Sequence, residues 1–332
     1  MERILVRLPN WLGDLLMARP LLHALRRALP DAEITVVGEP ALLDLIAGEA
    51  VADQRRVWTR EPAERAGLLR ELVGRRPDVA LVLPPSFSSA LFVWRAGARV
   101  RVGFRGEWRA FLLTRALPRP PRGDLHVSRE YLTLGAVVAP AVVAAPPPPA
   151  LRPPRQGVER AAAVMARAGV ARAPLALLGP GALYGPAKRW EAERFAAVGH
   201  ALAVRGYRVL VCGTAAEREV CEAVAAGVGG GALSLAGETD LATQAGLCAA
   251  ASLALCNDSG LAHLAAATGA PTVAVFGSTS SAWTAPLGPR VRIVQRAPVC
   301  APCFQRACRI GYRCLAAVGT DAVLGACLEV AA

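Results

Sequence analysis

The chain has 332 residues, of which 54% are hydrophobic and only 5% aromatic, and its formal net charge is +12. This length exceeds what one hydrophobic core usually supports, so two domains are expected. The low aromatic content favours layered α/β domains over a β-sandwich.

The positive charge is spread evenly along the chain. Residues 1–150 contain 21 arginines and 15 acidic residues, which leaves +6 in that part and +6 in the remainder. An even spread argues against a basic nucleic-acid-binding tail, so no nucleic-acid partner is expected. It suits anionic ligands such as phosphates or an anionic membrane surface; a solvated arginine-rich surface is the alternative.

No segment resembles an export signal, because residues 4–6 enter a strand-like run directly. The longest apolar stretch, residues 241–256, is too short to span a bilayer. Nine cysteines without a secretory context indicate a reducing compartment. The sequence therefore predicts a cytoplasmic protein, with peripheral contact at the inner face of an anionic membrane left open.

Strand-like runs alternate with helix-length segments in the first half of the chain. In chain order we expect a strand at 4–8, a helix at 15–29, a strand at 34–37, a helix at 41–46 and a buried strand at 79–83. This alternation is typical of a parallel sheet covered on both faces. Prolines then cluster within residues 139–157 and predict a semi-rigid linker.

The alternation restarts after the linker, with strands expected at 175–178, 208–212, 253–256 and 272–276. We expect an N-terminal α/β domain over 1–145, a linker over 146–156, a second α/β domain over 157–315 and a C-terminal helix over 316–332. Ligands of open α/β sheets bind beyond the carboxyl ends of the strands. The loops that follow the strands are therefore the places to search for a site.

The loop after the first strand reads Pro9-Asn10-Trp11-Leu12-Gly13-Asp14. Gly13 allows a tight turn, and Asp14 stands where a helix begins. The carboxylate is interpreted either as a helix cap or as a general base at a site. The G-x-G-x-x-G dinucleotide fingerprint is absent, which disfavours an NAD enzyme, and no cofactor is expected.

The loop after the strand at 175–178 combines three glycines and two prolines with Lys188 and Arg189 at its end. A pliable loop with a cationic end suits a phosphate-bearing leaving group, although the Walker A order is missing. Lys188 is the only lysine among 38 cationic residues. A lysine ammonium is compact, whereas an arginine guanidinium is a planar fork. The alternative is a surface loop before a helix.

Two further loops carry polar side chains. Glu217 follows the strand at 208–212 and either accepts hydrogen bonds from a ribose or favours a helix N-terminus through its charge. The most specific loop follows the strand at 253–256, because its amides at a helix start form an anion site. Its candidate residues are Asp258, Ser259, Gly260, Leu261 and His263. Asp258 could orient those amides or cap the helix, and His263 could be a packed core residue.

Four cysteines near the C-terminus have the spacing C-x2-C-x4-C-x5-C, at Cys300, Cys303, Cys308 and Cys314. Such a set could hold zinc through thiolates, but irregular thiolate spacings give many false matches. No two aspartates stand two residues apart, so the D-x-D metal clamp of many nucleotide-sugar transferases is missing.

Taken together, these loops resemble the lipopolysaccharide heptosyltransferases of glycosyltransferase family 9, most closely the ADP-heptose:lipopolysaccharide heptosyltransferase II group. The resemblance covers most of the chain, and its motifs occur in family order. They are Pro9-Asn10-Trp11-Leu12-Gly13-Asp14, Gly185-Pro186-Ala187-Lys188-Arg189-Trp190, Asn257-Asp258-Ser259-Gly260-Leu261-Ala262-His263 and Cys300-x-x-Cys303-Phe304-x-Arg306-x-Cys308.

The resemblance implies a GT-B fold, with two Rossmann-like domains facing across a cleft, and inverting transfer of heptose from ADP-heptose to the lipopolysaccharide inner core. It makes Asp14 the base, Lys188 the partner of the diphosphate and Glu217 the partner of the ribose. The amides from Ser259 to Leu261 would bind phosphate oxygens. The expected substrate-binding set is completed by Asn10, Gly13, Arg189, Asp258, Gly260 and His263.

Two positions depart from the family pattern: Cys256 replaces an expected hydroxyl residue, and Ser278 replaces a usual proline. Both put the fit of the donor in doubt. A nucleotide-sugar epimerase, or a GT-B enzyme acting on another nucleotide sugar, is the alternative function, because fold alone does not decide activity. A binding protein that has lost catalysis is disfavoured by the presence of Asp14 and Lys188.

Overall fold

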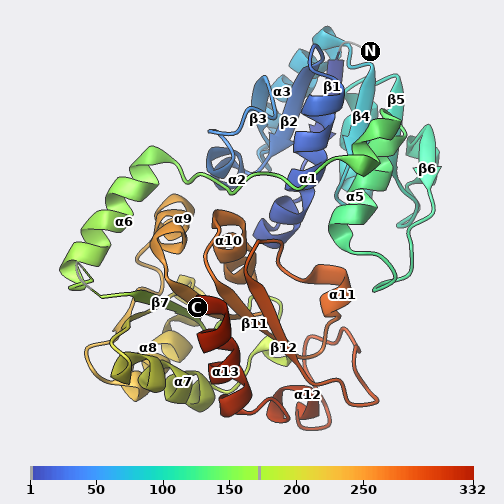
Figure 1. The fold of residues 1–332 in the computed structure, drawn as a ribbon. Helices are drawn as coiled ribbons and strands as arrows, with labels where there is room; N and C mark the ends of the chain where they lie inside the picture. Colours follow the sequence, from blue (N-terminus) through green and yellow to red (C-terminus); the bar gives the residue numbers. More distant parts are fainter. Residues whose placement is uncertain (1–2, 171–172) are drawn as a thin grey trace. The chain divides into compact units, whose positions relative to one another are not determined.

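The computed structural model of the chain describes residues 3–170 and 173–332 (Figure 1). Contacts divide the chain into two compact units, Met1–Pro149 and Ala150–Ala332. The division falls inside the stretch predicted as a linker. Each unit contains one six-stranded, entirely parallel sheet, which confirms the α/β class.

The sheet of the N-terminal unit has the strand order β3-β2-β1-β4-β5-β6. In chain order its strands are β1 (Arg3–Arg7), β2 (Glu33–Gly38), β3 (Gln54–Val57), β4 (Val79–Val82), β5 (Val100–Phe104) and β6 (Arg115–Leu117). The central strands are apolar because both of their faces are covered by helices. This order is that of dinucleotide-binding folds, in which the chain reverses its direction of travel across the sheet between β1 and β4.

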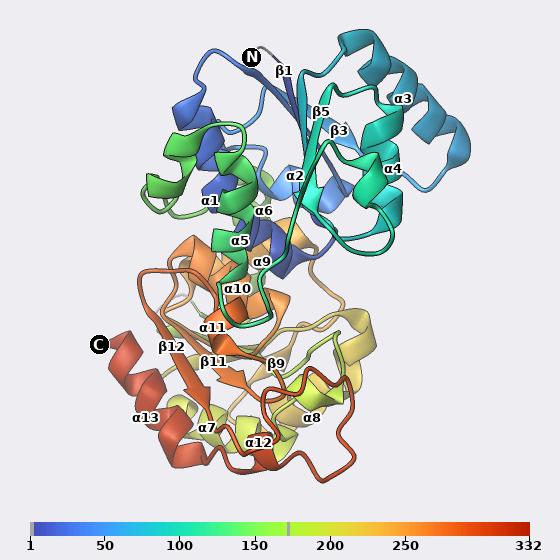
Figure 2. The same ribbon diagram turned by 90° about the vertical axis from the view of Figure 1, so that its right-hand side faces the viewer.

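Helices cover both faces of this sheet. Figure 2 shows α1 and α5 on one side of the strands and α3 and α4 on the other. The helical segments are α1 (Leu12–Ala28), α2 (Pro40–Leu45), α3 (Pro62–Arg75), α4 (Phe87–Arg95), η1 (Ala110–Leu112), α5 (Val127–Ala136) and η2 (Pro140–Ala144). The face under α3 and α4 is a buried apolar cluster that includes Leu72, Val82 and Val93.

The C-terminal unit repeats this topology, with the strand order β12-β11-β10-β7-β8-β9. Its strands are β7 (Leu175–Gly179), β8 (Arg208–Val211), β9 (Leu233–Ser234), β10 (Leu253–Asn257), β11 (Thr272–Phe276) and β12 (Val291–Gln295). Counted from β7, the order is the same as in the first unit, and the reversal lies between β7 and β10. The two units are therefore built on one plan.

The helices of the second unit form two layers, with α6, α9 and α10 on one face and α7, α8 and α13 on the other (Figure 1). The helical segments are α6 (Arg155–Arg167), η3 (Pro186–Lys188), α7 (Ala192–Val204), η4 (Ala215–Glu217), α8 (Arg218–Val228), α9 (Leu241–Ala250), α10 (Gly260–Thr268), α11 (Ser281–Thr284), α12 (Arg313–Ala316) and α13 (Thr320–Ala331). The face under α7, α8 and α13 is the main apolar core of this unit.

Two predicted boundaries differ from the structure. Helix α6 begins at Arg155, inside the predicted linker, because Pro154 takes the N-cap position, where its missing N–H costs nothing. The C-terminal helix predicted over 316–332 is two segments, α12 and α13, with Gly319 in an extended conformation as the N-cap of the second. Among residues 3–170 and 173–332, no helix combines the length and apolarity that a bilayer crossing requires.

A buried ionic group links two residues of α1, Arg19 and His23, to Glu49. Arg19 Nε lies 3.1 Å from both carboxylate oxygens of Glu49, and His23 Nε2 lies 3.4 Å from Oε1 of the same residue. Arg19 also donates a 2.9 Å hydrogen bond to the Pro149 carbonyl. Burial alone would raise the pKa of Glu49, but the hydrogen bonds and charges of His23 and Arg19 outweigh it and hold that pKa below its usual range.

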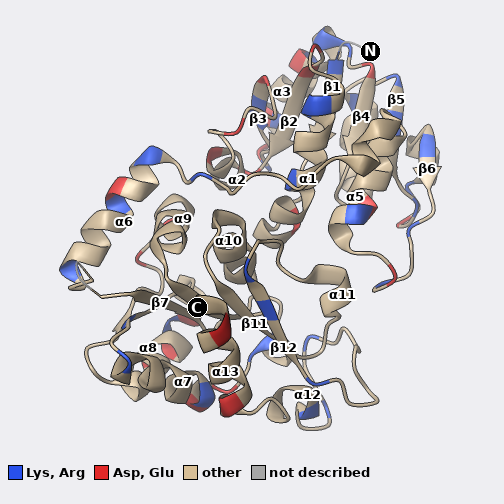
Figure 3. Ribbon diagram, in the orientation of Figure 1, with Lys and Arg blue, Asp and Glu red and all other residues tan. Residues whose placement is uncertain are grey.

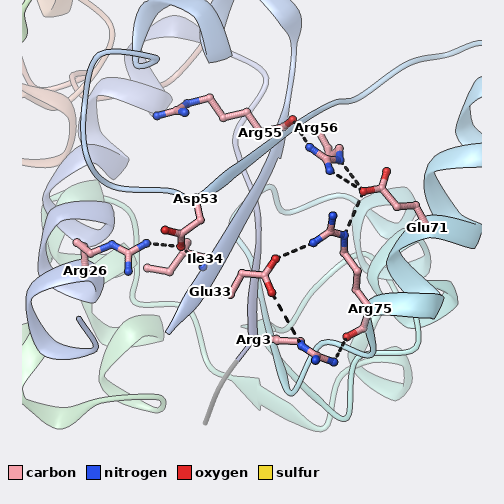
Figure 4. A network of polar contacts seen from close by, with 9 residues as sticks. All are labelled: Arg3, Arg26, Glu33, Ile34, Asp53, Arg55, Arg56, Glu71 and Arg75. Carbon is pink, nitrogen blue, oxygen red and sulfur yellow. Dashed lines mark hydrogen bonds and ion pairs between the residues drawn. The ribbon is translucent and has the colours of Figure 1, made fainter. Parts of the chain in front are cut away.

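A second ionic network lies at the amino ends of the strands (Figure 4). Glu33, at the start of β2, pairs with Arg75 at 2.6 Å, and Arg75 also contacts Glu71 at 3.1 Å. Glu71 in turn pairs with Arg56 of β3 at 2.7 Å. The side chains of these pairs are about one third exposed, so solvent screens each pair and limits its contribution to stability. Their position at the amino ends leaves the opposite edge of the sheet for ligands.

Candidate active site

The strand order of each sheet indicates where a ligand binds. In open α/β sheets the ligand lies outside the carboxyl ends of the strands, at the point where the strand order reverses. In the C-terminal unit this point lies beyond β7 and β10, and in the N-terminal unit beyond β1 and β4. The loops after β7 and β10 hold Lys188 and Asp258, and the loop after β1 leads into Asp14.

In the C-terminal unit these loops form a compact charged cluster. Lys188 Nζ lies 2.6 Å from Asp258 Oδ2, and their side chains are 13% and 3% exposed. The hydroxyl of Thr279, which follows β11, donates a 2.5 Å hydrogen bond to the same carboxylate oxygen. The ammonium also lies 4.8 Å from the centre of the Tyr184 ring, a cation–π distance. The single lysine of the chain is thus held in one place at the end of the central strands.

One buried amide clamps the loop that carries Lys188. Asn257, the last residue of β10, accepts a 3.0 Å hydrogen bond from the Trp190 backbone N–H and donates a 2.6 Å bond to the Pro180 carbonyl. Trp190 is itself buried, and its indole N–H donates to the Val318 carbonyl at 3.1 Å. Both ends of the loop are therefore tied to the sheet and core, which fixes the position of Lys188 between them.

Helix α10 starts directly beyond this cluster. Its N-cap is Ser259. The Ser259 side chain makes no capping hydrogen bond to the first turn among the residues that the structure describes. Asp258 is not the cap, because it pairs with Lys188 and Thr279 instead. The amides of Gly260 and Leu261 open this helix, where backbone N–H groups and the helix dipole favour an anion. His263 is buried one turn further on.

Glu217 performs the helix-start role that the sequence allowed. Its Oε2 accepts hydrogen bonds from the backbone N–H and the hydroxyl of Thr214, both at 2.9 Å, in a capping box. Its Oε1 faces the β7 loop, because a Cβ atom placed on Gly181 would collide with that oxygen. Glu217 is buried, and its carboxylate fits against the loop because residue 181 is a glycine and has no Cβ atom.

In the N-terminal unit, α1 begins at Leu12, three residues earlier than predicted, and its N-cap is Trp11. Asp14 is therefore in the first helical turn and does not hold the cap position. Burial raises the pKa of the Tyr131 hydroxyl, and the nearby Asp14 carboxylate raises it further. Asp14 is thus a partly buried carboxylate beside a buried phenol, at the carboxyl end of the central strand.

Arg7 stabilises the turn before Asp14 through a hydrogen bond to Asn10. The Arg7 guanidinium donates a 2.6 Å hydrogen bond to the Asn10 side-chain oxygen, and it lies 4.4 Å from the centre of the Trp58 ring. Burial lowers the pKa of Arg7 to about 10, with the charge of Glu39 opposing the shift. Asn10 itself is exposed.

Comparison with known proteins matches this arrangement to one family. The model of glycosyltransferase family 9 (heptosyltransferase) matches residues 65–313. The chain is 34% identical over 307 residues to lipopolysaccharide heptosyltransferase 2 of Escherichia coli K12, with 88% of each chain covered. The chain belongs to glycosyltransferase family 9, the heptosyltransferases. The family resemblance inferred from the loops is confirmed.

Two further matches support this assignment. Lipooligosaccharide heptosyltransferase 2 of Haemophilus influenzae is 30% identical over 322 residues, with 88% of each chain covered. A solved structure of E. coli ADP-heptose lps heptosyltransferase II is 29% identical, covers 100% of this chain and 98% of its own, and superposes with a TM-score of 0.82. The predicted GT-B type of α/β fold is thereby confirmed.

The four C-terminal cysteines of this heptosyltransferase have different environments. Cys300 and Cys303 are exposed, whereas Cys314 is buried against the core of the unit, and burial raises its pKa. Cys308 Sγ accepts backbone hydrogen bonds from residues 310 and 312, which hold its pKa below the usual value. Across the described parts of the chain, no group of three or more such side chains is placed to hold a metal ion.

The sequence did not single out several residues that complete the two sites. Tyr184 stands in the loop after the strand at 175–178, and Thr279 follows the strand at 272–276, but nothing in the sequence indicated that both would contact the lysine–aspartate pair. Tyr131 lies on α5, more than a hundred residues from Asp14. Glu130, the residue before it, is fully buried and pairs with Arg119 at 2.8 Å. The single acidic residue in the sequence of α5 is a signal that could have pointed there.

Proposed function

We propose that this heptosyltransferase transfers heptose from ADP-heptose to the inner core of lipopolysaccharide, with inversion at the anomeric carbon and without a metal ion. The observation that carries the proposal is the buried Lys188–Asp258–Thr279 cluster at the strand reversal of the C-terminal unit. The names of the relatives, lipopolysaccharide heptosyltransferase 2 and ADP-heptose lps heptosyltransferase II, support the donor and the acceptor.

On the donor side, the leaving group is a nucleoside diphosphate, which gains negative charge as the sugar departs. The Lys188 ammonium is held in place by its ion pair with Asp258. The first amides of α10, at Gly260 and Leu261, follow Asp258 directly in the chain. Fixed cationic and N–H groups aimed at developing charge can lower a barrier by several kcal/mol. The second oxygen of Glu217, facing the β7 loop, is available to accept a hydrogen bond from the ribose.

On the acceptor side, we assign the general base to Asp14. The acceptor hydroxyl gives its proton to the Asp14 carboxylate, its oxygen bonds to the anomeric carbon, and the bond from that carbon to the diphosphate oxygen breaks. Attack from the face opposite the leaving group inverts the configuration. The position of Asp14 in the first turn of α1, beyond the end of β1, is where an acceptor at the strand reversal would lie.

Asp14→Asn tests this assignment, with Glu64→Gln as the matched control. Glu64 is also an acid in the first turn of a helix, but it belongs to α3 and is exposed. We expect Asp14→Asn to keep the fold and ADP-heptose binding and to lose transfer to purified inner-core acceptor, because an amide cannot take the proton. Glu64→Gln should retain full turnover. Near-normal kcat in Asp14→Asn would disprove the assignment.

Release of ADP from ADP-heptose tests the metal, and analysis of the nucleotide-sugar products tests the alternative reaction. Transfer should persist in excess EDTA, and activity that returns only after Mg²⁺ or Mn²⁺ is added would reject the metal-free mechanism. Conversion of ADP-heptose into an isomeric nucleotide sugar, without any acceptor and without release of ADP, would indicate an epimerase in place of a transferase.

A further inference from the structure

One segment of the N-terminal unit is strongly basic. Residues 85–122 contain eight arginines and one acidic residue, so this segment alone contributes +7 of the net +12. In Figure 3 basic positions recur on β6 and on the chain that follows it. The even division of charge between the two halves of the sequence therefore hides a local concentration.

The same segment exposes large aromatic side chains. Trp108 is 93% exposed and Phe111 is 74% exposed. Phe87 and Trp94 are also exposed and stand seven residues apart on α4, which places them on one face of that helix. The Phe87 and Phe111 rings are 6.2 Å apart, so α4 and η1 contribute to one continuous surface. In the C-terminal unit, by contrast, the described tryptophan and phenylalanine side chains are buried or half-buried.

The loop that presents Trp108 is held in a fixed conformation. Glu107 and Trp108 both adopt left-handed backbone conformations, with φ of 45° and 57°, which non-glycine residues rarely do. The buried Arg109 stabilises the turn by donating to the Phe104 carbonyl at 2.9 Å and to the Pro84 carbonyl at 2.5 Å. The Glu107 carboxylate accepts a 3.2 Å hydrogen bond from the Phe87 N–H, which ties the loop to α4. A strained loop that is held this firmly indicates that the exposed tryptophan serves a function.

We infer that this aromatic–arginine surface, made by Phe87, Trp94, Trp108 and Phe111 with Arg95, Arg105 and Arg115, docks the enzyme on the surface of an anionic phospholipid bilayer. A bilayer interface satisfies both parts of the surface at once. Tryptophan and phenylalanine rings settle at the headgroup level, while arginines pair with lipid phosphates. A protein partner would need acidic residues to match the exposed arginines of this surface.

Flotation with phospholipid vesicles tests the inference without donor or acceptor, so its outcome does not depend on the proposed reaction. Wild-type protein should bind vesicles that contain phosphatidylglycerol, bind pure phosphatidylcholine vesicles weakly, and dissociate at high salt because the arginine contribution is screened. Trp108→Ser/Phe111→Ser should weaken binding strongly. Arg95→Gln/Arg115→Gln should weaken it by roughly 30-fold, since each arginine near an anionic surface contributes about fivefold.

The matched control is Val204→Ser/Arg167→Gln, which removes one exposed apolar and one exposed basic side chain from the C-terminal unit. It should bind vesicles like the wild type, and all variants should keep turnover with a soluble inner-core oligosaccharide. Unchanged vesicle binding in both surface variants, or equal weakening in the control, would overturn the inference. Loss of turnover on the soluble acceptor with vesicle binding intact would instead assign the surface to the acceptor glycan.

Discussion

Replacing Lys188 by methionine should affect stability as well as catalysis, because the lysine is paired with a buried carboxylate. At 2.6 Å and an effective dielectric constant of about 20, the two charges attract each other by about 6 kcal/mol before desolvation is counted. Removing one partner of a buried pair costs about 3–5 kcal/mol. Since Lys188 keeps 13% exposure, we expect the lower end, about 3 kcal/mol. For a unit of this size that lowers Tm by about 6–12 °C.

A double-mutant cycle separates this structural cost from the catalytic one. Asp258→Asn keeps the ammonium, and Lys188→Met/Asp258→Asn removes both charges while Thr279 retains an acceptor oxygen. The double variant should recover to within about 1 kcal/mol of the wild type, because no unpaired charge remains buried. If Lys188 meets the leaving diphosphate, the double variant should still lose on the order of 10²-fold in kcat/KM, mostly in kcat.

The assays are urea unfolding for stability and steady-state ADP release for kinetics, with all four proteins measured side by side. The decisive result is the activity of the double variant. If its turnover returns together with its stability, Lys188 serves only to neutralise Asp258, and the donor-phosphate assignment is refuted. Lys188→Arg should recover part of the activity, because a planar guanidinium cannot place its charge as a compact ammonium does.

Two further predictions concern stability. The pKa of Glu49 is held below its ordinary value of 4.5, so its contribution to stability is complete above that pH and is lost as the pH falls further. Glu49→Gln should therefore show a flatter decline in unfolding free energy below pH 4.5, and an unchanged slope would contradict the pairing with Arg19 and His23. Asn257→Ala should cost about 2–4 kcal/mol in urea unfolding, because the Trp190 N–H and a loop carbonyl lose their partner. A loss below about 0.5 kcal/mol would show that water replaces the clamp.

The sequence predicted the central strands of both sheets but none of the edges. β1, β4, β7 and β10 lie at the strand reversals and are covered on both faces, so their apolar runs stand out. The strands β3, β6, β9 and β12 are the four edges, and they are short or contain arginine, as in the sequence QRRV of β3. Edge strands have fewer neighbours and need less apolar character, so periodicity does not reveal them. β5 was missed as well, because arginine interrupts its apolar residues.

The candidate site was predicted as separate loops but not as contacts. Lys188 and Asp258 were each singled out by the loop that carries them, yet they lie 70 positions apart, and only the β7–β10 pairing brings them together. The two interpretations of Asp14 depended on where α1 begins, and boundaries of this kind are the least certain part of a sequence reading. Glu217 contacts Thr214 with one carboxylate oxygen and faces Gly181 with the other. The second contact joins two separate loops, so no local sequence pattern predicts it.

The confinement of lysine to one position also gives this enzyme a built-in reporter. Apart from the α-amino group, Lys188 is the only primary amine in the chain, so reductive methylation with ¹³C-formaldehyde introduces a single side-chain NMR signal. That signal comes from an ammonium 2.6 Å from one carboxylate and 4.8 Å from one aromatic ring centre, and its chemical shift reports on both neighbours. Occupancy and protonation at the end of the central strands can therefore be followed on the otherwise unlabelled protein, without a mutation.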